Sequence, residues 1–163
     1  MKKLYVLTHG TAEADKPNPS LTKEAELQME EIRNIIGKEK FDLVIVGVGK
    51  RHKQTFEFLF ADVEKPEIEE SELVGVPETL SSDKKELIFP DNRRMTVEEY
   101  AKNVYPKLQQ NLSLFVKKLL KRKGENALIV GGRIVPHTLG VKEPTSGALY
   151  IFDKKLNLIN IHI

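Results

Sequence analysis

The sequence predicts an α/β protein in which a mostly parallel sheet is connected by crossover helices. Two observations indicate this class. Short apolar runs alternate with longer segments of helical periodicity, and no internal repeat or linker interrupts the alternation. A chain of 163 residues with 40% hydrophobic and 31% charged residues is long enough to bury a core. We therefore expect one domain over residues 1–163.

The first element is the run KLYVLT at 3–8, which has the length and composition of a buried strand. Thr22 then precedes two glutamates and an apolar period of helical spacing that ends at Gly37. A capping residue, early acidic residues and a terminal glycine predict a helix over this stretch. The run DLVIV at 42–46 is the second expected strand.

The middle of the chain is expected to be mostly helical on either side of an irregular region. A helix is predicted from about 51 to 61. Residues 63–91 contain prolines and many acidic side chains, so we expect loops there, with at most one short strand and one short helix. From the N-cap Thr96 a long apolar stripe runs to Lys123, and Pro106 is expected to kink or divide this helix.

The last third contains a third strand at 127–130, which runs into two glycines, and a terminal hairpin formed by 147–152 and 158–163. In the final strand, isoleucines alternate with polar residues, which predicts a half-buried strand whose isoleucines face the core.

Composition excludes several classes of function. The net charge is only +2 with both signs interspersed, which argues against nucleic acid as a partner. The absence of cysteine excludes a disulfide framework, a thiolate zinc site and a cysteine nucleophile. We predict neither a metal nor another cofactor. Imidazole chemistry is limited to four side chains: His9, His52, His137 and His162.

No segment approaches the roughly 18 apolar residues of a membrane span, and the apolar run that begins at Leu4 is too short for a signal peptide. We therefore expect a cytoplasmic protein that does not associate with membranes.

The residues best suited to chemistry follow the three predicted strands. They are Thr8-His9-Gly10, the segment 47–51 and Gly131-Gly132-Arg133. Ligands bind α/β sheets at the carboxyl ends of the strands, so these segments are expected to converge. An imidazole, guanidinium groups and glycine-lined backbone amides suit a phosphoryl group, and an imidazole can attack phosphorus directly.

At these residues the sequence resembles the histidine phosphatase superfamily, also called phosphoglycerate-mutase-like. That family has a first strand ending Arg-His-Gly, a second ending Ser-Pro-x-x-Arg-Ala-x-Gln-Thr, and a later one ending Ser-His. The terminal hairpin and short length are most similar to the phosphohistidine phosphatase (SixA-type) branch. The segments that carry the resemblance are LYVLTHG at 4–10, SLTKEAELQ at 20–28, FDLVIVGVGKRHKQTFEFL at 41–59, NALIVGG at 126–132 and TSGALYIFDKKLNLINIHI at 145–163.

The resemblance implies a three-layer α/β/α sandwich around a mixed, mostly parallel sheet. It also implies that His9 is the nucleophile and that Arg51 holds the phosphoryl group. A middle-region carboxylate usually supplies the general acid. We favour Glu72 over Glu78, because an acidic residue often precedes a leucine there. The residues expected to contact substrate are Thr8, Gly10, Arg51, Gly132, Arg133 and His137.

Several family positions are replaced. Thr8 stands where the family has its first arginine, Gly47 and Val48 replace the Ser-Pro pair, and Gly132 stands where the second histidine would be. Two of the four groups that hold the phosphoryl group are therefore missing. One such donor contributes about 3–4 kcal/mol to the transition state, so weak activity is expected.

Two residues near the third strand are candidate replacements. His137 would take the vacant place if the strand ran on past the glycines. However, that register puts Gly131 and Gly132 inside a strand and leaves little chain for the following helix. We favour the register that ends at Gly132, with Arg133 supplying a charge to the site. We expect His52 and His162 to be exposed and without a role.

Three functions are compatible with this sequence. The first is an impaired phosphohydrolase that acts on a phosphorylated small molecule or phosphohistidine through His9. The second is an inactive pseudophosphatase that binds a phosphorylated ligand or a phosphoprotein. The third is an interaction domain whose site is vestigial. The sequence does not predict an oligomeric state, although the edge of the terminal hairpin is a candidate pairing surface.

Overall fold

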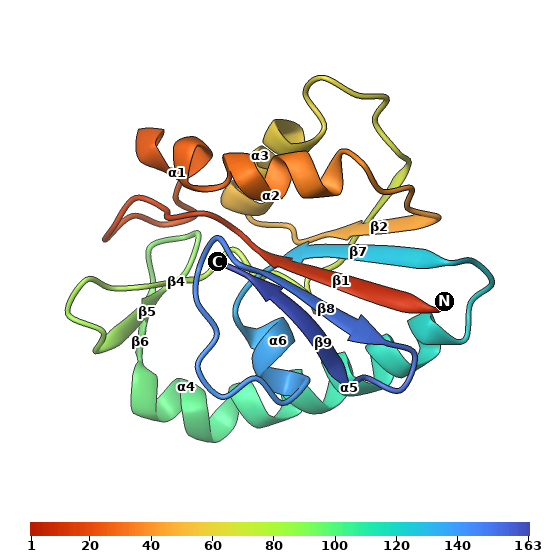
Figure 1. The fold of residues 1–163 in the computed structure, drawn as a ribbon. Helices are drawn as coiled ribbons and strands as arrows, with labels where there is room; N and C mark the ends of the chain where they lie inside the picture. The colour runs from red at the N-terminus through yellow and green to blue at the C-terminus, as the bar shows by residue number, and fades with distance from the viewer.

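The computed structural model describes residues 1–163 and is built on a six-stranded sheet in the order β3-β2-β7-β1-β8-β9 (Figure 1). The first four strands in this order pair in parallel, and the last two add antiparallel to one edge. The predicted mixed, mostly parallel sheet is confirmed. Its strands are β1 (Lys3–Thr8), β2 (Leu43–Val46), β3 (Ile68–Glu70), β7 (Asn126–Gly131), β8 (Leu149–Asp153) and β9 (Leu158–His162).

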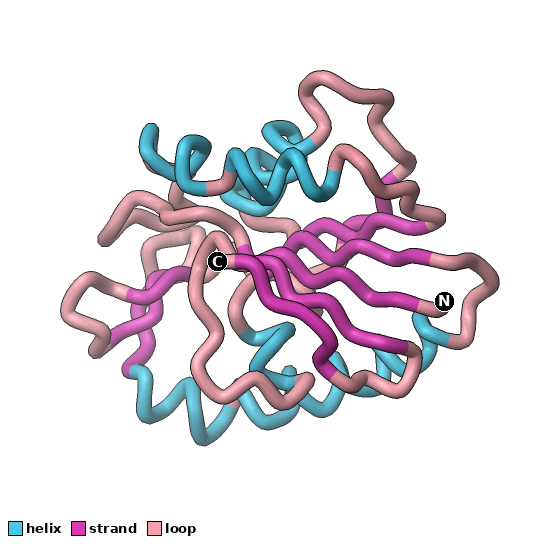
Figure 2. The backbone as a smooth tube through the Cα atoms, viewed as in Figure 1, coloured by secondary structure: helices cyan, strands magenta, loops and turns pink.

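Helices cover both faces of this sheet, so the predicted three-layer arrangement is confirmed (Figures 1 and 2). One face is covered by α1 (Lys23–Gln28), α2 (Glu30–Ile36) and α3 (Lys50–Leu59). The other is covered by α5 (Tyr105–Leu120) and α6 (Ile134–Thr138), and α4 (Val97–Asn103) precedes α5.

The core lies in two clusters, one on each face of the sheet. Along β1, Leu4 and Val6 pack in the cluster that includes Leu112 of α5, because alternate side chains of a strand point to opposite faces. Tyr5 and Leu7 pack in the cluster beneath α2 and α3. Burial on both faces explains why the central strands are continuous apolar runs.

The carboxyl ends of the three central parallel strands meet at one edge, as the sequence predicts. Thr8 pairs with Gly131, and the N–H of His9 donates to Gly131 O at 2.9 Å. The N–H of Gly47 donates to Val130 O at 2.9 Å. Three segments separated by dozens of residues therefore lie side by side at this edge.

Both long helical predictions are divided in the structure. The predicted helix after Thr22 breaks at Met29, whose side chain is fully buried against Gly10. The Thr22 hydroxyl donates to Thr11 O instead of capping the helix. The second helix is divided before Pro106, as predicted, and Thr96 caps it by accepting a hydrogen bond from the N–H of Glu99.

The irregular region contains more strand than expected and no helix. Besides β3 it holds β4 (Thr79–Leu80) and β5 (Glu86–Ile88), which form a separate small sheet with β6 (Arg94–Thr96). These strands are two or three residues long, so no periodicity marks them in the sequence.

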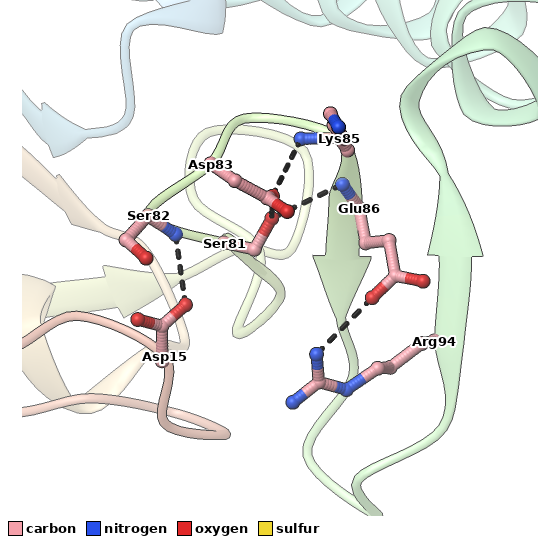
Figure 3. A network of polar contacts seen from close by, with 7 residues as sticks. All are labelled: Asp15, Ser81, Ser82, Asp83, Lys85, Glu86 and Arg94. Carbon is pink, nitrogen blue, oxygen red and sulfur yellow. Dashed lines mark hydrogen bonds and ion pairs between the residues drawn. The ribbon is translucent and has the colours of Figure 1, made fainter.

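A polar network joins the small sheet to the loop after β1 (Figure 3). The Asp15 carboxylate accepts a hydrogen bond from the N–H of Ser82 at 2.8 Å. In the β4–β5 turn the buried Ser81 hydroxyl donates to Asp83 at 2.6 Å and accepts from the N–H of Glu86 at 3.1 Å. These bonds hold the turn closed, and they hold β4, directly after Glu78, against the β1 loop.

The prediction that the last strand is half-buried is wrong, because side chains on both of its faces are exposed. Ile159, Ile161 and Ile163 are 52%, 42% and 85% exposed, although the strand forms as predicted. β9 is the edge strand and pairs only with β8, and its exposed residues show that no layer covers it. None of the helices is both long and apolar enough to span a bilayer.

Candidate active site

His9 lies just beyond the end of β1 and is held in one tautomer. Its Nδ1 lies 2.7 Å from Gly10 O, and a carbonyl oxygen only accepts, so Nδ1 carries the proton. Its Nε2 accepts from Nε–H of Arg51 at 3.1 Å, which requires a lone pair on Nε2. The imidazole is therefore neutral, with its nucleophilic nitrogen turned toward the guanidinium.

Arg51 lies in the first turn of α3 and is 6% exposed. Apart from its bond to His9, its guanidinium donates to three backbone carbonyls of the segment before β4. The three distances are 3.0 Å to Val76 O, 3.4 Å to Pro77 O and 2.7 Å to Glu78 O. Burial lowers the pKa of Arg51 to about 10, an effect that the Glu78 carboxylate opposes. Arg51 thus stays a cation at neutral pH.

The electrostatic environment keeps His9 unprotonated. Burial lowers the pKa of His9 to about 3, and the positive charges of Arg51 and Arg133 add to this effect. A neutral imidazole at physiological pH is the form that can attack phosphorus.

Of the two candidate carboxylates, the structure places Glu78 beside Arg51. Its Oε2 is buried without a hydrogen-bond partner, and its charge acts on both Arg51 and Tyr100. Burial, and then the charge of Glu78, raise the pKa of Tyr100 to about 12. Glu72 is exposed in the turn after β3 and makes no hydrogen bond through its side chain. The geometry therefore favours Glu78 over Glu72, contrary to the sequence-based preference.

The third predicted strand, β7, ends at the glycines, as the favoured register has it, and does not run on to His137. It ends at Gly131, and the residues after Arg133 form α6. His137 lies on α6 and is exposed, with Nδ1 2.8 Å from the hydroxyl of Tyr105, so it does not occupy the end of the strand. Arg133 is exposed, and its charge acts on His9, Arg51 and Tyr105.

The overall likeness to solved structures decides the fold. No protein-family model and no curated protein matches the sequence. The protein histidine phosphatase SixA complexed with tungstate matches with a TM-score of 0.64 at 15% identity, over 99% of this chain and 94% of that one. This chain has the histidine phosphatase fold.

Two further structures have the same arrangement. The mycobacterial glucosyl-3-phosphoglycerate phosphatase matches with a TM-score of 0.62 at 11% identity, over 98% of this chain and 97% of that one. A protein from Thermus thermophilus, TTHB049, matches with a TM-score of 0.62 at 14% identity, over 98% of each chain.

Two positions at which the chain departs from the histidine phosphatase motifs have distinct surroundings. Thr8 is fully buried, and its hydroxyl donates to Thr145 O at 2.6 Å and accepts from the N–H of Ala148 at 3.0 Å. These hydrogen bonds hold the loop before β8 against β1, and the hydroxyl is not directed at His9. Gly132 is open, since a Cβ there would meet only Ile134, at 4.0 Å.

Gly10 serves both His9 and the core. Its carbonyl orients the imidazole, as described above. A Cβ on Gly10 would lie 2.7 Å from the terminal methyl of Met29 and 3.0 Å from the Ala25 Cβ, so the glycine lets α1 and Met29 pack closely against this loop.

The expectation that His52 is exposed is wrong. Its ring is fully buried and lies edge-to-face against His9, with ring centroids 5.1 Å apart and an interplanar angle of 75°. The sequence carries one signal of this, namely a bulky residue directly after Arg51, where the resembling motif has alanine. Tyr100, near Glu78, is a second aromatic residue of the site that the sequence did not reveal.

Folding stability is expected to fall as the pH drops from 7 to 5. Burial lowers the pKa of both His9 and His52 in the folded chain, whereas in the unfolded chain both titrate near 6.5. The unfolded state therefore binds more protons below pH 6.5, and acid favours it. Because its pKa falls to about 3, His9 contributes about 2 kcal/mol to this loss between pH 7 and 5, and His52 adds to it in the same direction.

Urea unfolding at several pH values measures this slope. The variant His52→Leu is expected to show a smaller dependence, because one of the two proton acceptors is removed. Equal slopes for His52→Leu and the unmodified protein between pH 7 and 5 would contradict the assignment.

Proposed function

We propose that this chain is a phosphohydrolase that acts through a phosphorylated His9. The observation that carries the proposal is the fixed tautomer of His9, which leaves the Nε2 lone pair beside the Arg51 guanidinium. The fold is that of a histidine phosphatase that binds tungstate and of a sugar-phosphoglycerate phosphatase, which supports phosphoryl chemistry at this edge of the sheet.

In the first step, the lone pair of His9 Nε2 forms a bond to phosphorus as the bond to the leaving oxygen or nitrogen breaks. The Glu78 carboxylate takes the proton of the bound monoanionic phosphoryl group and passes it to that leaving atom. The Nε–H of Arg51 changes its hydrogen-bond acceptor from His9 Nε2 to a phosphoryl oxygen, and the guanidinium stabilises the developing charge on that oxygen. The Nδ1–H of His9 stays hydrogen-bonded to Gly10 O throughout, so the phosphorylated ring keeps its orientation.

In the second step, water attacks phosphorus and the P–N bond breaks. The Glu78 carboxylate takes the proton from the water and passes it to the departing phosphate, so that His9 and Glu78 return to their starting states. Atoms and charge balance over the two steps without a metal or other cofactor. Arg133, from the segment after β7, is the second cation that we assign to the phosphoryl oxygens.

The proposed substrates are a phosphorylated small molecule or phosphohistidine. The alternative is a pseudophosphatase that binds a phosphorylated ligand or a phosphoprotein without turnover. One observation favours this alternative: Arg51 already donates to three carbonyls and to His9, so a phosphoryl group must displace some of these contacts. The open Gly132 provides no second imidazole.

Phosphate release from p-nitrophenyl phosphate and from phosphohistidine, with trapping of the acid-labile phosphoenzyme, tests the proposal. We expect slow turnover, at least 100-fold below that of a complete site, because two phosphoryl-holding side chains are missing. Stabilisation by phosphate or vanadate without turnover would support the pseudophosphatase instead. Neither turnover nor stabilisation at millimolar anion would indicate a vestigial site.

Glu78→Gln is expected to lower kcat about 100-fold for an alkyl phosphate and much less for p-nitrophenyl phosphate. An alkoxide needs a proton as it leaves, whereas p-nitrophenolate is stable without one. Steady-state kinetics with the two substrates measure the difference.

Glu72→Gln is the matched control, because it makes the same change at an exposed carboxylate of the same region. Equal effects of Glu72→Gln and Glu78→Gln, or equal losses on both substrates, would remove Glu78 from the acid role.

A further inference from the structure

The buried histidine next to Arg51 occupies a space lined by glycine. His52 is fully buried, and neither of its ring nitrogens has a hydrogen-bond partner. Three glycines, here called the glycine cradle, surround the ring. A Cβ on Gly47, Gly49 or Gly75 would lie 2.8, 2.6 or 2.7 Å from a ring atom of His52.

These distances are too short for any side chain, so the imidazole and the cradle require one another. Gly47 and Gly49 follow β2, and Gly75 lies in the segment that continues to Glu78, so the ring separates two stretches of backbone. The bond from the N–H of Val48 to Gly75 O, at 2.9 Å, joins the same two stretches. The ring is therefore held by backbone, and only small movements are open to it.

The contact that this ring makes with His9 is directional. The two rings meet edge-to-face at 5.1 Å and 75°, an arrangement in which the positive edge of one aromatic ring faces the π-system of the other. The polar contacts of His9 are one bond at each ring nitrogen, to Gly10 O and from Arg51 Nε. A phosphoryl group that drew Arg51 away would leave the bond to Gly10 as the only polar restraint.

We propose that His52 is a positioning residue for His9: held in the glycine cradle, it keeps the His9 imidazole in the orientation that presents Nε2 at the strand ends. His52 acts through His9 and does not touch substrate. The inference rests on the proposed function only in taking His9 as the nucleophile, because the positioning itself belongs to the substrate-free protein.

The chemistry of His52 fits this role. Burial is the largest cause that lowers the pKa of His52 well below its usual value, and the positive charge of Arg51 adds to it, so the ring stays neutral beside a neutral His9. Because it makes no hydrogen bond, its effect on His9 is carried by ring contact and shape alone. His52 also fits the replacement of the Ser-Pro pair by Gly47 and Val48, because the side chain of a serine at position 47 would overlap the His52 ring.

Imidazole ¹⁵N NMR of the substrate-free protein tests the proposal directly. In the unmodified protein we expect His9 to show a single Nδ1–H tautomer, together with NOEs between the His9 and His52 ring protons. A tautomer mixture at His9, or no such NOEs, would overturn the proposal without any variant being made.

In His52→Leu, which has similar volume but no aromatic ring, we expect the His9 nitrogen resonances to move toward the average of two tautomers. If the phosphoenzyme forms, its rate of formation should fall two- to tenfold with KM within twofold. His162→Leu, at a histidine of the edge strand β9 to which no role is assigned, should change neither. Unchanged His9 resonances in folded His52→Leu would overturn the proposal. A protein that shows the His9 spectrum described above but no turnover would instead contradict only the phosphohydrolase function.

Discussion

His9→Asn is expected to abolish the phosphoenzyme and lower phosphate release at least 1,000-fold. The amide lacks a nucleophilic nitrogen, so the covalent route through Nε2 is lost. Asparagine still offers an oxygen near Arg51, so the guanidinium keeps an acceptor and the fold should survive. Acid-labile phosphate on the protein and phosphate release from p-nitrophenyl phosphate are the measurements.

His162→Asn is the matched control, because it makes the same chemical change at a histidine of the edge strand β9 to which no role is assigned. It should leave both signals unchanged. Turnover of His9→Asn within tenfold of the unmodified protein would show that His9 is not the nucleophile.

Gly131→Ala is expected to destabilise the fold by about 3 kcal/mol or more. Gly131 ends β7, and a Cβ there would lie 2.1 Å from Val74 O and 3.0 Å from Val74 C. Both are backbone atoms, so no side-chain rotation relieves the overlap. The shift required would also strain the bond from the N–H of His9 to Gly131 O. Urea unfolding monitored by circular dichroism measures the loss.

Gly132→Ala serves as the control one residue further along. Its Cβ would meet only Ile134, at 4.0 Å, so we expect a change in stability below about 1 kcal/mol. Similar losses for the two variants would mean that the approach of Val74 to Gly131 is not as close as the structure has it.

The strand ends that form the site could be predicted because each strand is encoded locally. A continuous apolar run bounded by turn residues specifies a buried parallel strand, and parallel strands present their carboxyl ends at one edge. This reasoning placed His9, Gly47 and Gly131 together, and the backbone bonds between these segments confirm it. Pro106 likewise marked the division between α4 and α5, because proline is tolerated in the first turn of a helix.

The same reasoning was wrong where a side chain depends on a distant partner. In the sequence His52 is one member of a basic cluster, which predicts an exposed side chain. Its burial depends on Gly75, which lies far along the chain and packs against the His52 ring. The prediction that Thr8 contacts substrate stays a prediction, and its hydroxyl is bonded within the loop before β8, which no local pattern marks. The isoleucines of β9 alternate as a half-buried strand should, yet no layer covers them.

The sequence by itself determined the α/β class, the central strands and the position of His9 and Arg51 at their ends. These features depend on local periodicity, turn residues and the geometry of parallel strands. Only the tertiary structure decided which carboxylate lies beside Arg51, which tautomer His9 adopts and which second histidine contacts it. These depend on backbone carbonyls and glycines contributed by segments far apart in the chain, whose approach is set by packing.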